Sequence, residues 1–130
     1  MRTKVQETNK IILSVNDKPD MSSDVKEWLD ARGFAIVRAR STIRALELIN
    51  KARYDVVITN LRRTENGSKN DEAGTQLASS IRNMGLKVPI VMYTDNVNNG
   101  VRRKAVGAGV NAVCTLPDEL FRWLGKIASS

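Results

Sequence analysis

Short, continuously apolar segments alternate with helical patterns along this chain, and this alternation restricts its fold more than any other feature. The apolar segments are residues 10–15, 34–37, 54–59, 88–93 and 110–115. Strands that are apolar along their whole length lie in sheets covered on both faces, and strands that alternate with helices form parallel sheets. The sequence therefore predicts the α/β class: a doubly wound, five-stranded parallel sheet of order 2-1-3-4-5 with helices on both faces.

Five helical patterns follow these strands. The first is predicted to begin at Pro19, with Asp17 as its N-cap, and to end at Gly33. Ser41 is expected to cap the second, whose apolar face contains Ile43, Leu46 and Ile49. The other three carry apolar residues at helical spacing: Leu77 and Ile81; Val97, Val101, Ala105 and Ala108; Leu120, Phe121, Leu124 and Ile127.

The composition indicates one globular domain over residues 1–130, with a core over residues 10–128. Hydrophobic residues make up 42% and charged residues 27%, which is typical of a folded chain. No apolar run approaches the ~20 residues that span a membrane, and residues 1–10 lack the apolar core of a signal peptide. We therefore expect a cytoplasmic protein that does not enter the membrane. Cys114 cannot form an internal disulfide and is expected to be a buried thiol.

The sequence contains no histidine, so Ser-His and Cys-His nucleophile pairs and histidine-ligated metal sites are excluded. It also contains no Gly-rich phosphate loop and no G-x-S-x-G motif. These features argue against an enzyme. An enzyme or a small-ligand binder remains an alternative, because fold does not fix function and Asp17, Thr94 and Asp95 converge in the predicted sheet.

The net charge is +7, from 21 Lys and Arg against 14 Asp and Glu. Such a charge favours anionic partners. The basic residues are scattered in short groups, and no aromatic residue lies beside them to stack on nucleic-acid bases. We therefore expect a protein partner with an acidic surface, and a nucleic acid bound through the basic surface is the alternative.

Polar residues follow the ends of the predicted strands. In a doubly wound sheet, the carboxyl ends of the strands border the functional crevice. The residues placed there are Asn16, Asp17, Asn60, Thr94, Asp95, Leu116 and Pro117. We expect these residues to form the candidate site.

Four segments carry a family resemblance. Residues 12–19 read ILSVNDKP, residues 55–60 read DVVITN, residues 88–94 read VPIVMYT, and residues 108–117 read AGVNAVCTLP. In this order and spacing they resemble the receiver domain of two-component response regulators, of the chemotaxis type with a flavodoxin-like fold. The resemblance covers residues 11–127.

The functional positions of that family carry over one by one, as the resemblance implies. The acidic pair falls on Asn16 and Asp17, the phosphoacceptor on Asn60, the switch hydroxyl on Thr94, its small neighbour on Asp95, the switch aromatic on Val113, and the lysine–proline pair on Leu116 and Pro117. By the same resemblance, the peptide bond before Pro117 is expected to be cis.

These replacements remove the chemistry of the family. An amide at Asn60 is a poor nucleophile where a carboxylate would attack phosphorus. Asp17 and two amides offer Mg²⁺ one anionic group where several are preferred. Leu116 cannot neutralise a phosphoryl group. The sequence therefore predicts a degenerate pseudo-receiver without catalytic residue, metal or cofactor.

The segment after the third strand departs from the family in two ways. Residues 61–73 form a polar segment that is several residues longer than its counterpart, and it is either a tolerated insertion or a partner-binding element. Asn66–Gly67 within it and Asn99–Gly100 later in the chain are predicted turns. Arg62 and Arg63 open the segment; one guanidinium is expected to approach Asp17 or Asp95 in place of Mg²⁺, the alternative being a solvated pair.

The function predicted from these observations is a signalling or regulatory module that binds a protein without being phosphorylated. The resemblance implies docking through the fourth helix, the fifth strand and the fifth helix. The candidate contacts there are Arg102, Arg103, Lys104, Val113, Arg122 and Lys126.

Overall fold

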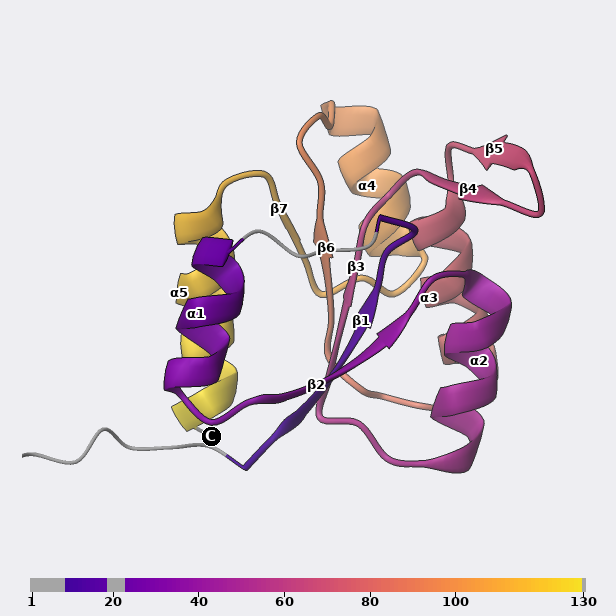
Figure 1. Ribbon diagram of the computed structural model, residues 1–130. Helices are drawn as coiled ribbons and strands as arrows, with labels where there is room; N and C mark the ends of the chain where they lie inside the picture. Colours follow the sequence, from indigo (N-terminus) through magenta and orange to yellow (C-terminus); the bar gives the residue numbers. More distant parts are fainter. Residues whose placement is uncertain (1–8, 19–22, 130) are drawn as a thin grey trace, which may run out of the picture.

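A computed structural model describes residues 9–18 and 23–129. Its main sheet consists of β1 (Ile11–Val15), β2 (Ala35–Ala39), β3 (Val56–Thr59), β6 (Ile90–Tyr93) and β7 (Ala112–Cys114). The strands are parallel and lie in the order β2-β1-β3-β6-β7 (Figure 1). This is the predicted order 2-1-3-4-5, because β4 and β5 belong to a separate hairpin. The predicted fold class is confirmed.

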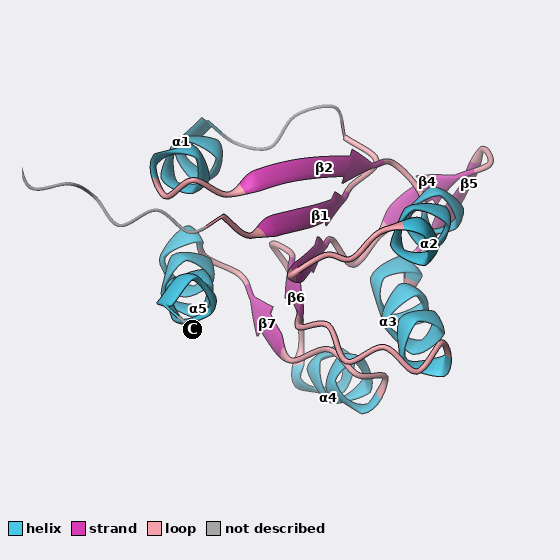
Figure 2. Ribbon diagram, turned by 90° about the horizontal axis from the view of Figure 1, so that it is seen from below, coloured by secondary structure: helices cyan, strands magenta, loops and turns pink. Residues whose placement is uncertain are grey.

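Helices cover both faces of the sheet, as Figure 2 shows. One face carries α1 (Ser23–Ala31) and α5 (Pro117–Ser129), and the other carries α2 (Thr42–Lys51), α3 (Ala73–Asn83) and α4 (Asn99–Gly107). Each strand residue packs against one layer, because successive side chains of a strand point to opposite faces. Ile12 and Val56 lie in the core under α1 and α5, whereas Leu13 and Val57 lie in the core under α2, α3 and α4.

An aromatic cluster joins α1 to α5. The ring of Trp28 stacks on Phe121, with 4.9 Å between ring centroids and 11° between planes, and it also stacks on Phe34 at 6.4 Å. The guanidinium of Arg32 lies 3.8 Å from the Trp28 ring centroid, as in a cation–π contact. Trp28 therefore reports on the packing of this layer.

Two predictions of helix geometry were wrong. Ser41 caps α2 as predicted, but Ile43 is 64% exposed, because the buried face of this helix runs through Ala45 and the predicted Ile49, four residues apart. The predicted start of the first helix at Pro19, which Asp17 would cap, falls on residues outside the described ones, and the described part of α1 begins at Ser23. Asn99–Gly100 is the first turn of α4, since the side chain of Asn98 caps the helix by accepting from the amide of Val101.

Residues 61–73 are not an irregular loop. They contain β4 (Arg63–Glu65) and β5 (Ser68–Asn70), which pair antiparallel around the predicted Asn66–Gly67 turn. Both turn residues have positive φ, 53° for Asn66 and 76° for Gly67, as a tight hairpin turn requires. Figure 1 shows this hairpin extending from the carboxyl edge of the sheet on the side of α2 and α3.

Candidate functional site

The carboxyl ends of the strands border a cavity of about 560 Å³. It brings together most of the candidate residues from the sequence, including both arginines of the hairpin. The candidates that line it are Asn16, Asp17, Asn60, Arg62, Arg63, Thr94 and Asp95, and Lys18, Thr64, Lys69, Tyr93 and Thr115 complete the lining.

Leu116 and Pro117 do not line this cavity. Leu116 is 60% exposed and Pro117 is exposed as the first residue of α5. The expectation of a cis bond before Pro117 was wrong, because the described residues contain no cis peptide. Proline suits the first position of a helix, where no backbone donor is needed.

The side-chain amide of Asn60 is bonded through both its nitrogen and its oxygen. Its Nδ2 donates to Arg62 O at 2.9 Å and to the Oδ1 atoms of Asn16 and Asp17, each at 3.2 Å. Its Oδ1 accepts from Arg63 Nη1 at 2.7 Å. A carboxylate at this position would have no hydrogen to offer the first three oxygens, so the site is built for an amide.

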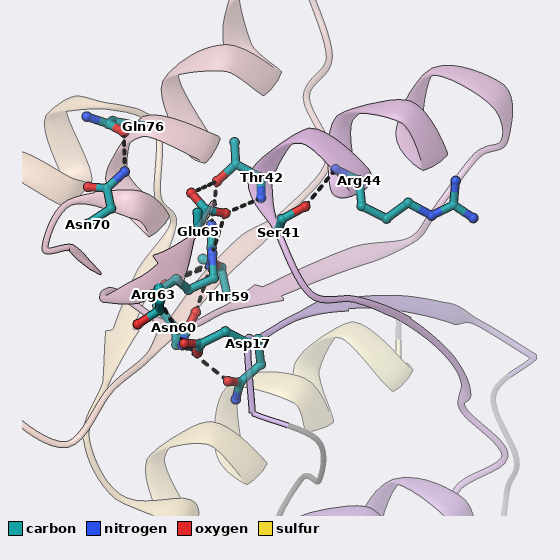
Figure 3. A network of polar contacts seen from close by, with 12 residues as sticks. Asp17, Ser41, Thr42, Arg44, Thr59, Asn60, Arg63, Glu65, Asn70 and Gln76 are labelled. Atoms are coloured by element: carbon teal, nitrogen blue, oxygen red, sulfur yellow. Dashed lines mark hydrogen bonds and ion pairs between the residues drawn. The ribbon is translucent and has the colours of Figure 1, made fainter. Parts of the chain in front are cut away.

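Arg63 is a buried cation, 1% exposed, whose guanidinium lies beside Asn60 (Figure 3). Its Nη1 donates to Thr59 Oγ1 at 2.7 Å as well as to Asn60, and its Nη2 donates to Thr42 Oγ1 at 2.9 Å. Its Nε forms an ion pair with Glu65 at 3.3 Å. Burial of a lone charge costs several kcal/mol, on the order of the stability of a small domain, so this full set of acceptors is what permits a guanidinium here.

Glu65 attaches the hairpin to α2. Its carboxylate accepts from both the backbone amide and the hydroxyl of Thr42, at the start of that helix (Figure 3). A negative charge is favourable there, because the first amides of a helix are unpaired and its N-terminus is positive. The hairpin is thus fixed at its base to two elements, the end of β3 through Arg63 and the start of α2 through Glu65.

Asp17 is the anionic group of the cavity that bonds directly to Asn60. Partial burial raises the pKa of the Asp17 carboxyl, but hydrogen bonds from the Thr64 amide and from Asn60, with attraction to Arg63, outweigh it, so the net shift is downward. Burial lowers the pKa of the Arg63 guanidinium, and Glu65 and Asp17 oppose that shift. Asp17 attracts Arg63 without forming an ion pair, since the ion-pair partner of Arg63 is Glu65.

Arg62 has a different role from its neighbour. Its Nη1 donates to Asn96 O at 3.2 Å, and the side chain is only partly buried. Of the two arginines, Arg63 is therefore the one that occupies the interior beside Asn60.

The residues of the cavity do not fit a divalent cation. No group of three or more His, Cys, Asp and Glu residues that could hold a metal occurs within residues 9–18 and 23–129. The oxygens of Asn16, Asp17 and Arg62 converge on the Nδ2 group of Asn60, a hydrogen-bond donor. Mg²⁺ requires anionic oxygens in near-octahedral geometry. Of the two carboxylates that line the cavity, Asp17 and Asp95, the first already faces the Asn60 donor and a nearby guanidinium.

Gly74, the second residue of α3, packs against the backbone of the site. A Cβ on Gly74 would lie 2.2 Å from Asn60 O and 3.0 Å from Met92 Cε. The Gly74 amide donates to Leu61 O at 2.9 Å. Only a residue without a side chain permits this approach, so Gly74 fixes the position of the chain after β3.

Five of the six predicted docking residues are exposed: Arg102, Arg103, Lys104, Arg122 and Lys126. Val113 is 7% exposed, so this prediction of a partner contact was wrong: it faces the core under α2, α3 and α4. Two of the exposed residues have partners within the chain, since Lys104 forms an ion pair with Glu72 and Arg102 donates to Val113 O at 2.9 Å.

Sequence reasoning missed three members of the site: Thr42, Thr59 and Glu65. Nothing in their local pattern marks them, because Thr59 reads as part of a buried strand and the other two read as surface residues. The Asn66–Gly67 turn was the available signal, since two antiparallel segments around it place Glu65 next to Ser68.

Residues 12–118 match the response regulator receiver domain. This chain therefore belongs to the receiver domain family, a family of two-component signalling modules. No curated protein sequence matches the chain.

Solved structures of similar fold agree with this assignment. A two-component response regulator from Clostridium difficile is 22% identical, with a TM-score of 0.76 over 91% of this chain and 94% of that chain. A receiver domain from Francisella is 17% identical, with a TM-score of 0.77 over 93% and 98%. A chemotaxis response regulator from Vibrio cholerae is 20% identical, with a TM-score of 0.72 over 91% and 98%. At these identities the likeness establishes the shared fold.

Among the residues that the structure describes, no helix has the length and apolar character needed to cross a membrane.

Proposed function

We propose that this chain is a pseudo-receiver of the chemotaxis-type fold: a cytoplasmic signalling module that binds a protein partner and is not phosphorylated. The observation that carries this proposal is the bonding of Asn60. Its amino group donates to the oxygens of Asn16, Asp17 and Arg62, and its carbonyl oxygen accepts from Arg63. Its hydrogen bonds therefore favour an amide where phosphoryl transfer needs a free carboxylate.

The chemistry of phosphoryl transfer supports the same proposal. An acyl phosphate forms when a carboxylate oxygen attacks phosphorus, and transfer relies on positioned cations that balance the developing charge. An amide oxygen is a poor nucleophile, and the one at Asn60 already accepts from a buried guanidinium. Leu116, the counterpart of the family lysine, is exposed and lies outside the cavity lining.

Phosphorylation is tested with the purified chain, acetyl phosphate and Mg²⁺. Intact-mass spectrometry is expected to find no phosphoryl adduct, while a receiver domain with the full acidic set, treated in parallel, gains one. Isothermal titration with MgCl₂ is expected to give no heat of specific binding. An adduct mapped to the carboxyl ends of the strands would refute the proposal.

We propose the edge formed by α4, β7 and α5 as the docking surface. Figure 2 shows α4 and α5 on either side of β7, the edge strand of the sheet. Arg103, Arg122 and Lys126 are exposed on these helices, and two exposed apolar residues, Val106 and Leu116, lie on the same elements or next to them. Apolar anchors with a basic rim suit a partner with an acidic surface.

The docking surface is tested by charge reversal. Affinity capture from the native cell is compared for the wild type and the double variant Arg122→Glu and Lys126→Glu, with Lys51→Glu on the exposed side of α2 as matched control. We expect the partner to be lost from the double variant and retained by the control, with unchanged melting temperatures. Equal capture by all three chains would refute docking at this edge.

The hairpin is a second candidate contact for the same partner. Its base is fixed by Arg63 and Glu65, and Lys69 on β5 is exposed. Deletion of residues 61–73 would remove buried Leu61, Arg63 and Ala73, so a point change is the cleaner test. Loss of capture in Lys69→Glu, with a normal melting temperature, would place the contact on the hairpin.

A further inference from the structure

A second cavity, of about 590 Å³, lies beside the first. The two share four lining residues: Asn16, Lys18, Asn60 and Tyr93. The second cavity is also lined by Val25 of α1, Arg44 of α2 and Leu120 of α5. Its volume lies in the range of sites for small organic ligands, which is about 300–1,000 Å³.

The lining of this cavity is basic. Lys18, Arg38, Arg40 and Arg44 contribute cationic side chains, and none of its described lining residues is Asp or Glu. Arg44 also lies 3.7 Å from Glu47, one helical turn away, in an exposed pair that carries little energy. The cavity therefore presents a positive field to a ligand that enters it.

The floor of the cavity is apolar. Val15, Val25, Ile58 and Leu120 line it and are at most 5% exposed, and the Tyr93 side chain lies at its border with the first cavity. An apolar or aromatic group of a ligand that rests on this floor gains about 25 cal/mol for each Å² of its own apolar surface removed from water. An inorganic ion has no such surface to bury.

We propose that this cavity binds a small organic phosphate of nucleotide size. Its phosphate would lie among Arg40, Arg44 and Lys18, because guanidinium groups match the geometry of phosphate oxygens and lysine adds a point charge. Its base or other ring would lie on the apolar floor. Binding is non-covalent, and the ligand is not transformed.

This inference goes beyond partner docking and does not depend on it. The ligand would contact Asn16 and Asn60, which belong to both cavities. Occupancy would thus be felt at the residues that replace the phosphorylation site. The chain would then respond to the concentration of a free metabolite. Because partner binding and ligand binding are measured in separate experiments, failure of one proposal is distinguished from failure of the other.

The experiment is isothermal titration of the full chain with each of the four ribonucleoside 5′-monophosphates. Adenosine and inorganic phosphate are titrated alongside, since each lacks one half of the proposed ligand, and a single-stranded oligonucleotide is titrated as the nucleic-acid alternative. Arg40→Gln and Lys18→Gln test the cationic side of the site. Arg53→Gln is the matched control, because Arg53 is exposed at the opposite end of the sheet, before β3.

We expect at least one monophosphate to bind with a Kd below about 1 mM, and binding to weaken about tenfold in Arg40→Gln and in Lys18→Gln but not in Arg53→Gln. Adenosine and inorganic phosphate should each bind at least about tenfold more weakly than that monophosphate. Thermal unfolding of every variant establishes that it is folded.

Three results would overturn the proposal. The first is no heat with any of the four monophosphates at millimolar concentration. The second is equal affinity in Arg40→Gln and Arg53→Gln, which would place the ligand elsewhere. The third is binding of a single-stranded oligonucleotide or of inorganic phosphate at least as tight as that of every monophosphate, which would assign the basic residues to a nucleic acid or to simple ion binding.

Discussion

Replacement of Asn60 by Asp would place a carboxylate at the position that the family resemblance assigns to the phosphoacceptor, and the structure predicts that the fold loses stability. The Nδ2 hydrogens that reach Arg62 O at 2.9 Å and the Oδ1 atoms of Asn16 and Asp17 at 3.2 Å disappear. The new negative charge is repelled by Asp17, while the contact with Arg63 Nη1 at 2.7 Å becomes an attractive ion pair. These two charge terms roughly cancel, which leaves two or three lost hydrogen bonds worth about 1 kcal/mol each.

We therefore expect the free energy of unfolding of Asn60→Asp to fall by about 2 kcal/mol at neutral pH. Urea denaturation followed by tryptophan fluorescence measures this change, because Trp28 stacks on Phe34 and Phe121 and loses these contacts on unfolding. Asn9→Asp makes the same chemical change at an exposed position and should change stability by less than about 0.5 kcal/mol. Equal or greater stability of Asn60→Asp would refute the argument that the site requires an amide.

Three further predictions concern the same region. Arg63→Ala should lower the free energy of unfolding by about 3 kcal/mol, because a buried ion pair loses one partner. Arg62→Ala should change it by less than about 0.5 kcal/mol. Equal effects of the two variants in urea denaturation would contradict the roles assigned to these arginines. Gly74→Ala should cost about 1–3 kcal/mol by its clash with the backbone, while Gly125→Ala, with open space around it, should be neutral or stabilising in thermal melts. Because the pKa of Asp17 is lowered on folding, its carboxylate stabilises the fold above about pH 4, and this stabilisation is lost as pH falls through the lowered pKa. The difference in the free energy of unfolding between wild type and Asp17→Asn should therefore vanish in acid. A difference that stays constant across the pH titration would exclude this role for Asp17.

The main sheet could be predicted from sequence because its signal is local and repeated. Each of the five strands is an apolar segment, and hydrophobic periodicity marks Leu77 and Ile81 as inward-facing on α3, as the structure has them. The same method placed Ile43 inside, because it favours large apolar side chains; the helix starts after the predicted Ser41 cap but buries the small Ala45 in place of Ile43.

The candidate site was only partly predictable for a different physical reason. Strand ends are fixed by topology, so Asn16, Asp17 and Asn60 could be placed together. A charged residue in a polar segment reads as solvated, yet Arg63 is buried because its neighbours Asn60 and Glu65, together with the distant Thr42, supply acceptors for its guanidinium. Acceptors at such irregular spacings leave no periodic pattern in the sequence.

The effect of replacing the hairpin depends on the amide at position 60, and the effect of replacing that amide depends on the hairpin, which is a form of epistasis. Arg63 and Glu65 hold the base of the hairpin only while Asn60 offers an oxygen and Thr42 a hydroxyl. A shortened segment would remove the guanidinium, and an altered position 60 would disturb the contacts made by the segment. If the proposed function holds, phosphoryl chemistry at position 60 would need several coordinated substitutions, because each single change is predicted to give a less stable chain.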